Sequence, residues 1–214
     1  MRRWSLGLTA LSLLAFVAVT GGTAAIERSI PACEELLTLD QAAGAMGEKL
    51  ARFLNRAVTY SSTRRCDYFG GSQGSSTSHA LGVEWGPYSD YRKNTKPFAR
   101  KFICPVNEAA CRKLIATARI KSNLESFLAV RRALSVLGTA RALPASAFDG
   151  NPSLVLTPDR AFGALSDGAY VLVYDRKSAH LLYVICDDTS DASDIKPDSA
   201  CAIAAAKTAY DNIT

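Results

Sequence analysis

The clearest apolar pattern lies in the last third of the chain. Two segments rich in β-branched, aromatic and other apolar residues, Ala169 to Asp175 and Ala179 to Asp187, are separated only by Arg176, Lys177 and Ser178. A short polar loop between two such segments favours a hairpin. We therefore expect a pair of antiparallel strands in this part of the chain.

The first half of the chain shows three more apolar runs. They predict strands near Arg65 to Phe69, Ala80 to Trp85 and Phe98 to Cys104. Between them lie the Gly/Ser-rich segment Gly70 to Ser78 and the polar segment Pro87 to Lys96, whose composition is typical of loops. The first half is therefore expected to be a set of strands joined by long loops.

A helical pattern occupies the middle of the chain, over residues 122–137. Ser122 and Glu125 have the spacing of a capping box, and Gly138 follows as a stop signal. We expect this helix to connect two halves of the protein and to pack on a sheet. Its apolar face is formed by Leu124, Phe127, Leu128, Leu134 and Leu137.

Two short matches indicate an internal duplication. The segment from Leu37 to Met46 aligns with the segment from Leu156 to Leu165, with six identical positions out of ten. Phe102-Ile103-Cys104 then matches Val184-Ile185-Cys186, and each triplet is followed by a second cysteine in an Ala-rich segment. A repeat of this kind predicts two copies of one structural unit. Chance similarity between Ala-rich helices is the alternative.

Each proposed copy also begins with the signals of a short helix. Thr38 is a candidate N-cap with Gln41 three residues later, which is the spacing of a capping box. Thr157 is the corresponding candidate cap, and Pro158 follows at the first helical position, where proline is tolerated. We expect a helix at the start of each copy.

Composition and these patterns together predict an α+β fold. The chain is 48% hydrophobic and 21% charged, which excludes collagen-like and disordered classes. We expect two related halves, residues 31–119 and 150–212, each combining a helix with antiparallel strands. Residues 26–214 are expected to form a single domain, in which the helix over residues 122–137 joins the halves.

The N-terminal segment has the features of a secretory signal peptide. Arg2 and Arg3 precede an apolar stretch from Leu6 to Val19, and the small residues Thr23 to Ala25 follow. The apolar stretch is shorter than the roughly 18 to 20 residues that a membrane-spanning helix needs. We therefore expect removal of residues 1–25 and a soluble exported protein, periplasmic or extracellular, without a transmembrane anchor.

All six cysteines lie in the part that is expected to be exported. An even number of cysteines in an oxidising compartment predicts disulfides. The repeat pairs each strand cysteine with the cysteine of the following helix, which leaves the two N-terminal cysteines to pair with one another. The expected bonds are Cys33–Cys66, Cys104–Cys111 and Cys186–Cys201.

The N-terminal half also resembles a known class of proteins. The sequence Cys33-Glu-Glu-Leu-Leu-Thr at the start of a helix, a helix ended by glycine, and then Cys66-Asp-Tyr on a strand resemble small exported bacterial cell-envelope proteins of actinobacterial type, whose function is unknown. The resemblance covers residues 31–86 and 154–212. It implies an α+β fold of α-β-β units around an antiparallel sheet and an envelope location. It brings no catalytic residues.

Charge is distributed unevenly along the chain. Residues 92–141 contain 12 basic and 2 acidic side chains, whereas residues 142–214 contain 5 and 10. A basic zone of this kind raises the local potential and can attract an anionic envelope component or an acidic protein. The alternative is a solvated face, or pairing with the acidic run Asp187 to Asp198. The candidate anion-binding residues are Arg92, Lys93, Lys96, Arg100, Lys101, Arg112, Lys113, Arg119, Lys121, Arg131 and Arg132.

A non-enzymatic binding or interaction module of the cell envelope is therefore the expected function. A small serine hydrolase is the alternative, because Ser72 lies in a Gly-x-Ser-x-Gly pattern. Asp149, Asp159, Asp175 and His180 follow in the chain order of α/β hydrolases. However, the serine-rich residues after Ser72 start a helix poorly, and no parallel β-α alternation surrounds them. We therefore expect no enzyme activity.

No cofactor, metal or nucleic acid is expected. The acidic run Asp187 to Asp198 lacks the ligand spacing, central glycine and distal glutamate of a calcium loop. With the cysteines oxidised, only His79 and His180 remain as good nitrogen ligands for zinc. Few aromatic residues accompany the basic zone, so it does not form a stacking platform for nucleic acid.

Overall fold

The computed structural model describes residues 30–49, 51–57, 62–70, 79–93, 113, 121–136, 138, 140–156, 169–188 and 196–214. For residues 51–57, 91–93, 188 and 196–197 it describes the backbone alone. The helices are α1 (Cys33–Leu36), α2 (Leu39–Met46), α3 (Tyr88–Lys93), α6 (Asn123–Val136), the 3-10 helix η2 (Ala145–Phe148) and α7 (Ser199–Ile213). The strands are β1 (Ala51–Ala57), β2 (Arg64–Gly70), β3 (His79–Pro87), β4 (Ala140–Ala142), β5 (Ser153–Leu156), β6 (Ala169–Asp175), β7 (His180–Asp188) and β8 (Lys196–Pro197).

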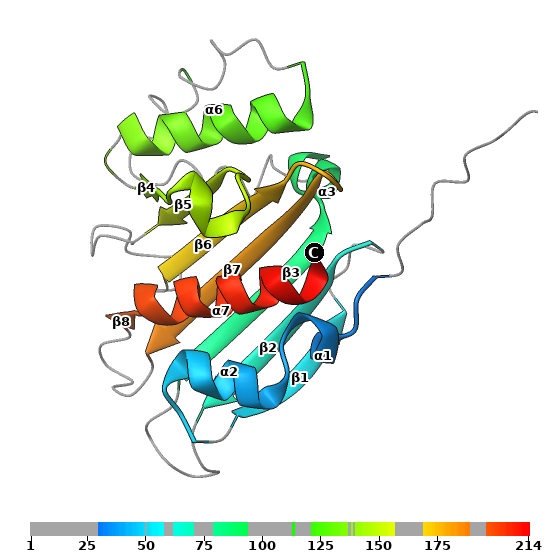
Figure 1. Ribbon diagram of the computed structural model, residues 1–214, viewed down its shortest axis with the longest axis vertical. Helices are drawn as coiled ribbons and strands as arrows, with labels where there is room; N and C mark the ends of the chain where they lie inside the picture. The colour runs from blue at the N-terminus through cyan, green and yellow to red at the C-terminus, as the bar shows by residue number, and fades with distance from the viewer. Residues whose placement is uncertain are drawn as a thin grey trace, which may run out of the picture.

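The strands form one antiparallel sheet in the order β1-β2-β3-β7-β6-β5-β4, and β8 pairs with the end of β7 (Figure 1). Strands β3 and β7 lie side by side at the centre, with Val83 opposite Val184. The strands before residue 88 therefore form one half of the sheet and those after residue 139 form the other half. This architecture confirms the α+β class with antiparallel strands.

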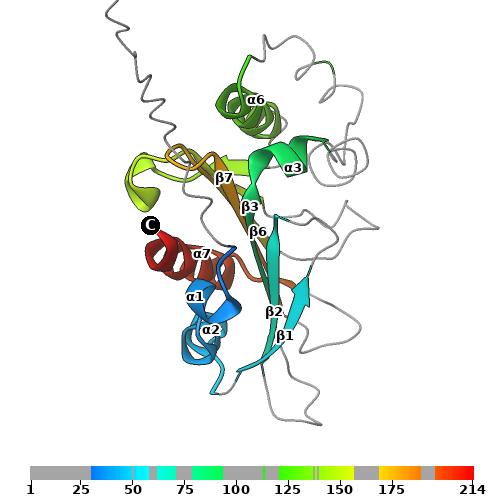
Figure 2. The same ribbon diagram turned by 90° about the vertical axis from the view of Figure 1, so that its right-hand side faces the viewer.

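Helices α1, α2 and α7 cover one face of the sheet (Figure 2). The side of α7 that meets the sheet is made of fully buried alanines, Ala202, Ala205, Ala206 and Ala209. Because alanine has the smallest apolar side chain, the helix backbone can lie close to strands β6 and β7. The main core forms between these helices and the inward side chains of the strands, including Tyr68, Val83 and Leu182.

Helix α6 lies on the other side of the sheet, together with α3 (Figure 2). Phe127 and Leu134 of α6 are buried in a second core with Leu154, Leu172 and Tyr174 of the strands. Tyr88 of α3 joins this core, and its ring packs in T-shaped arrangements with the rings of Phe127 and Tyr174. The expectation that this helix packs on a sheet is confirmed.

Local signals in the sequence correctly predicted the ends of two helices. Thr38 accepts a hydrogen bond from the Gln41 backbone at 3.2 Å, and the Gln41 side chain accepts one from the Thr38 backbone at 2.9 Å. Ser122 and Glu125 form the same reciprocal pair before α6. Gly138 has a φ of 71°, in the left-handed region that favours glycine, so it ends α6 as expected.

The predicted hairpin and the two predicted strands that the structure describes are also confirmed. Strands β6 and β7 pair with Asp175 opposite His180 around a four-residue turn. Strands β2 and β3 match the expected segments in the first half. The strand expected over residues 98–104 and the helix expected after Thr157 lie outside the described residues.

Two of the three expected disulfides are present, Cys33–Cys66 and Cys186–Cys201. The first fastens α1 to β2, and the second fastens the first turn of α7 to β7. The expected bond between Cys104 and Cys111 lies outside the described residues, as do the signal segment and Ser72.

The internal duplication stays a prediction. The aligned segment that begins at Leu156 starts at the last residue of β5 and continues beyond the described residues. The triplet Phe102-Ile103-Cys104 is outside them as well. The structure therefore shows two halves that meet in one sheet, and their descent from one repeated unit is not confirmed.

Candidate functional site

The structure describes part of the predicted basic zone. Lys113, Lys121 and Arg132 are exposed, Arg131 is half-buried, and Arg141, which belongs to the same zone, is exposed on β4. For Arg92 and Lys93 only the backbone, in α3, is described. The remaining candidates lie outside the described residues: Lys96, Arg100, Lys101, Arg112 and Arg119.

Four of these basic residues lie just before α6, on it, or on the strand that follows it. We call Lys121, Arg131, Arg132 and Arg141 the α6–β4 basic surface. Lys121 precedes the helix, the two central arginines lie in its second half, and Arg141 lies on β4, which α6 contacts. The one acidic residue of α6, Glu125, accepts hydrogen bonds from the Ser122 backbone and from the Lys121 backbone at the helix start.

None of these four basic side chains forms an ion pair within the described residues. The described members of the acidic run that was considered as their counter-charge lie elsewhere. Asp187 and Asp188 end strand β7 near β8, whereas α6 lies at the top of Figure 1. Asp198 caps the first turn of α7, where it accepts a hydrogen bond from the Cys201 backbone. The described residues thus give no support to pairing between the two charged regions.

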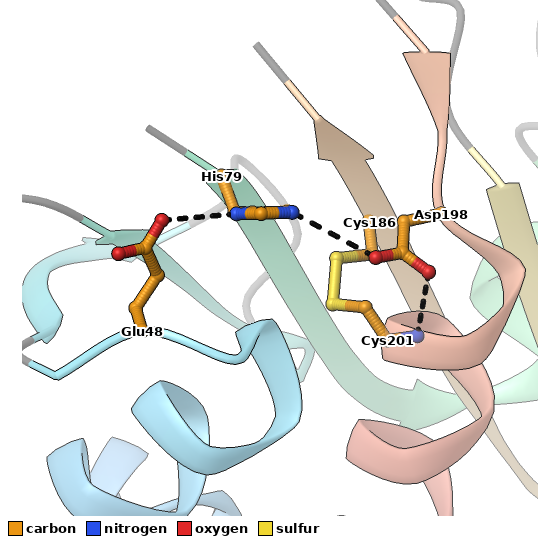
Figure 3. A network of polar contacts seen from close by, with 5 residues as sticks. All are labelled: Glu48, His79, Cys186, Asp198 and Cys201. Atoms are coloured by element: carbon orange, nitrogen blue, oxygen red, sulfur yellow. Dashed lines mark hydrogen bonds and ion pairs between the residues drawn. A yellow bond between two sulfur atoms is a disulfide. The ribbon is translucent and has the colours of Figure 1, made fainter. Parts of the chain in front are cut away.

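A second polar arrangement lies beside the Cys186–Cys201 disulfide (Figure 3). His79 lies between two carboxylates: its Nδ1 is 3.1 Å from Oε1 of Glu48, and its Nε2 is 3.7 Å from Oδ2 of Asp198. These residues come from the segment after α2, the start of β3 and the N-cap of α7. The contacts therefore hold three elements together at one end of the sheet, and no described hydroxyl or thiol nucleophile joins them.

A third arrangement lies on the face of the sheet opposite α7. Arg65, Asp67 and Glu84 form what we call the Glu84 cluster. Arg65 is the cross-strand partner of Glu84, and Glu84 is in turn the partner of Tyr183, so these three side chains share one face. The Arg65 Nε donates a hydrogen bond to Asp67 Oδ1 at 2.9 Å. Glu84 is 6% exposed.

The electrostatics of this cluster are unusual for a sheet surface. Burial raises the pKa of Glu84, nearby Arg65 offsets part of that rise, and Asp67 adds to it. For Arg65, burial would lower the pKa, but Asp67 and Glu84 raise it above its usual value. These three residues were not among those predicted from the sequence to form a site. The pattern Gly82-x-Glu84-x-Gly86 was a signal for them, because an acidic residue between two glycines is uncommon within a strand.

The residues considered for a serine hydrolase have structural roles where they are described. Asp175 is buried and accepts hydrogen bonds from the Lys177 and Ser178 backbones in the hairpin turn and from Tyr210. Burial would raise the pKa of Asp175, but hydrogen bonds from these groups hold it below its ordinary value. His180 is the cross-strand partner of Asp175.

Within the described residues, neither His180 nor Asp149 is placed as a member of a catalytic triad would be. The His180 ring stacks on Trp85 and its Nδ1 contacts the Ser178 carbonyl oxygen at 2.8 Å. Asp149 is exposed and ends η2. Asp159 and Ser72 lie outside the described residues, so the elbow itself is not tested.

No family model, curated protein or solved structure matches the chain. Within the described ranges, no set of three or more His, Cys, Asp and Glu side chains is arranged to hold a metal ion. The part of the chain that the structure describes also contains no helix long and apolar enough to span a membrane. The site must therefore be judged from its own geometry.

Proposed function

We propose that the protein is an exported, non-enzymatic binding module whose α6–β4 basic surface contacts anionic phospholipid headgroups of the cell envelope. The observation that carries this proposal is a group of basic side chains, three exposed and one half-buried, with no acidic partner among the described residues. Near an anionic membrane each such residue contributes about 1 kcal/mol of binding free energy.

An exposed apolar side chain beside these charges supports a lipid surface over a soluble polyanion. Val136 is 65% exposed, which is the highest value among the large hydrophobic residues of the described chain. It lies four positions after Arg132, so the two side chains lie on the same side of α6. Basic residues next to an exposed apolar residue are typical of helices that lie at a membrane interface.

The disulfides support the exported location. The described residues contain two disulfides. Disulfides form and persist in oxidising compartments and are rare in the cytosol. They accompany the signal-like segment that precedes residue 26.

The proposal predicts salt-sensitive binding to anionic vesicles. We expect the mature chain to co-float with vesicles that contain about one third phosphatidylglycerol and not with pure phosphatidylcholine vesicles. Binding should weaken between about 50 mM and about 500 mM NaCl, because salt screens the attraction. Reversing three exposed charges, Lys121→Glu, Arg132→Glu and Arg141→Glu, should weaken binding by at least roughly a hundredfold, at about 1 kcal/mol per residue.

A matched control carries the same change in net charge at other sites. Lys49, Lys177 and Lys207 are exposed and lie outside the α6–β4 basic surface. The variant with all three changed to Glu should keep most of the binding. Equal loss in both variants would show that only net charge matters, and retention by soluble polyphosphate with no vesicle binding would show that the partner is a polyanion instead of a lipid surface.

A further inference from the structure

His79 is the only basic partner that two carboxylates have among the described residues. Its Nδ1 lies 3.1 Å from Oε1 of Glu48, and its Nε2 lies 3.7 Å from Oδ2 of Asp198 (Figure 3). Within the described part of the chain, no lysine or arginine forms an ion pair with either carboxylate. The charge of this one ring therefore decides whether the two carboxylates have a counter-charge.

A neutral imidazole cannot serve both carboxylates. It carries one N–H, so it donates to one carboxylate while the lone pair of its other nitrogen faces the second. The imidazolium carries an N–H on each nitrogen and attracts both, and a hydrogen bond from a charged donor is roughly twice as strong as one from a neutral donor. The side chain of His79 is 20% exposed, so protons from solvent reach the ring. Protonation therefore strengthens the contacts with both carboxylates at once.

The elements that meet at His79 differ in how firmly they are held. Asp198 precedes the first turn of α7, which the Cys186–Cys201 disulfide fastens to β7, and β7 pairs with the strand that carries His79. The disulfide and the sheet thus keep Asp198 near His79 whatever the charge of the ring. Helix α2 contains no cysteine. Its C-terminal end is therefore the part that can move when the charge of the ring changes.

Backbone geometry places the Glu48 side chain against His79. Gly47 ends α2 with a φ of 69°, and the Glu48 N–H then donates to the Ala43 carbonyl oxygen at 2.9 Å. A Cβ on Gly70, the last residue of β2, would lie 2.5 Å from Cγ of Glu48, so the glutamate side chain lies directly over this glycine. The contact with His79 is thus tied to the last turn of α2.

We propose that His79 is a pH-sensitive clasp for the C-terminal end of α2. In acid, the imidazolium attracts the Glu48 carboxylate and fastens this end to β3, while Asp198 stabilises the positive charge from the other side. At higher pH the neutral ring makes at most one weaker hydrogen bond, and the end of α2 is held mainly by the burial of Met46. It should then open more often.

The remaining charged groups beside this strand end do not reverse the sign. On β7, Asp188 is the register partner of His79, and on β8, Lys196 is the register partner of Asp188. These two residues carry opposite charges and add no net charge. The carboxylates of Glu48 and Asp198 therefore set the preference for the protonated ring.

Hydrogen exchange at the end of α2 tests the clasp. The amides of Gly47 and Glu48, whose hydrogen bonds close this end, are followed in the mature wild-type chain and in His79→Gln. Both proteins are measured at about pH 5 and about pH 8, the range in which histidine changes its charge. Glutamine stays neutral, and comparison at one pH cancels the intrinsic exchange rate. We expect the wild type to exchange roughly two to five times more slowly than the variant at the acidic pH, the factor of a partly exposed ion pair, and at nearly the same rate at the higher pH.

Two further variants and a matched control decide the assignment. Glu48→Gln and Asp198→Asn remove one charge each with little change in size, and asparagine is also a good N-cap, so each should reduce the pH dependence even if His79→Gln fails to fold. The second histidine of the chain, His180, stacks on Trp85 and forms no ion pair among the described residues. His180→Gln should therefore produce no pH-dependent difference at the end of α2. The same ratio of rates at both pH values, or equal pH dependence in His180→Gln, would overturn the proposal.

Discussion

Among single residues, Glu84 is held in surroundings that disfavour its charged form. It lies on the central strand β3 between Arg65 and Tyr183, and burial raises its pKa above the ordinary value of 4.5. The native state thus holds the proton of this carboxyl more tightly than the unfolded chain does. Its contribution to stability is present below about pH 4.5 and is lost as the pH rises through the raised pKa.

Glu84→Gln should remove this pH dependence. Because glutamine does not titrate, the variant should gain stability relative to the wild type between about pH 4.5 and about pH 7, by about 1.4 kcal/mol for each pH unit by which the pKa is raised. Urea denaturation of both proteins across this range measures the difference. A difference that stays constant over the range would contradict the assigned direction of the pKa.

Tyr210 links the last helix to the hairpin turn through one hydroxyl group. Its OH donates to Asp175 Oδ1 at 3.2 Å and accepts from Asn151 Nδ2 at 2.6 Å. Asn151 in turn accepts a hydrogen bond from the Arg176 backbone at 2.7 Å. This buried group therefore connects α7, the segment just before β5 and the turn between β6 and β7.

Tyr210→Phe should lower the free energy of unfolding by about 1 to 3 kcal/mol, because it leaves the Asn151 amide without its acceptor in a buried place. The loss should be smaller at acidic pH. Hydrogen bonds hold the pKa of Asp175 below its ordinary value, so its contribution is lost as the pH falls through that pKa. Denaturation at neutral and acidic pH tests both statements, and an equally stable variant at neutral pH would show that the hydroxyl is not needed.

At the level of elements, the Cys186–Cys201 disulfide and the alanine face of α7 hold the same helix. The disulfide spans a sequence separation of 15 and joins the first turn of α7 to β7. A loop of this length corresponds to about 3 kcal/mol if the entropy of the unfolded chain dominates. The double variant Cys186→Ala/Cys201→Ala should therefore lose roughly 2 to 4 kcal/mol of stability.

Hydrogen exchange gives this prediction a local readout. Amides in the first turn of α7 should exchange faster in the double variant. Amides of α6, which lies on the other face of the sheet, should change their exchange rates only as far as the stability of the whole fold changes. Uniform acceleration in both helices would mean that the bond stabilises the whole fold and not the start of α7.

Elements with local signals were predicted correctly, and elements without them were not. Helix α6 was predicted from the Ser122 capping box and from Gly138. The hairpin was predicted from the three polar residues between β6 and β7. Each of these signals lies within a few residues of the element that it predicts. Strand β1, by contrast, has the sequence Ala-Arg-Phe-Leu-Asn-Arg-Ala, which shows neither a continuous apolar run nor strict alternation. Strand β4 has only three residues. Both lie at edges of the sheet, where burial on two faces is not required.

On the scale of the whole molecule, pairing between distant strands creates the sites. Residues 65, 84 and 183 come together only because β2, β3 and β7 pair in one register. A one-residue slip would move each side chain to the opposite face. The sequence could therefore indicate a sheet and a basic zone without indicating the Glu84 cluster. The residues of the α6–β4 basic surface all lie between positions 121 and 141, so they could be predicted from the sequence.

The central pairing of β3 with β7 also has a consequence for the order of folding. His79 to Pro87 pair with His180 to Asp188, so the chain must close a loop of about one hundred residues before the middle of the sheet exists. Contacts so distant in sequence slow folding. A nascent chain that ends before His180 presents β3 as an unpaired edge, and an edge of this kind is the part of a sheet most prone to pair with another chain.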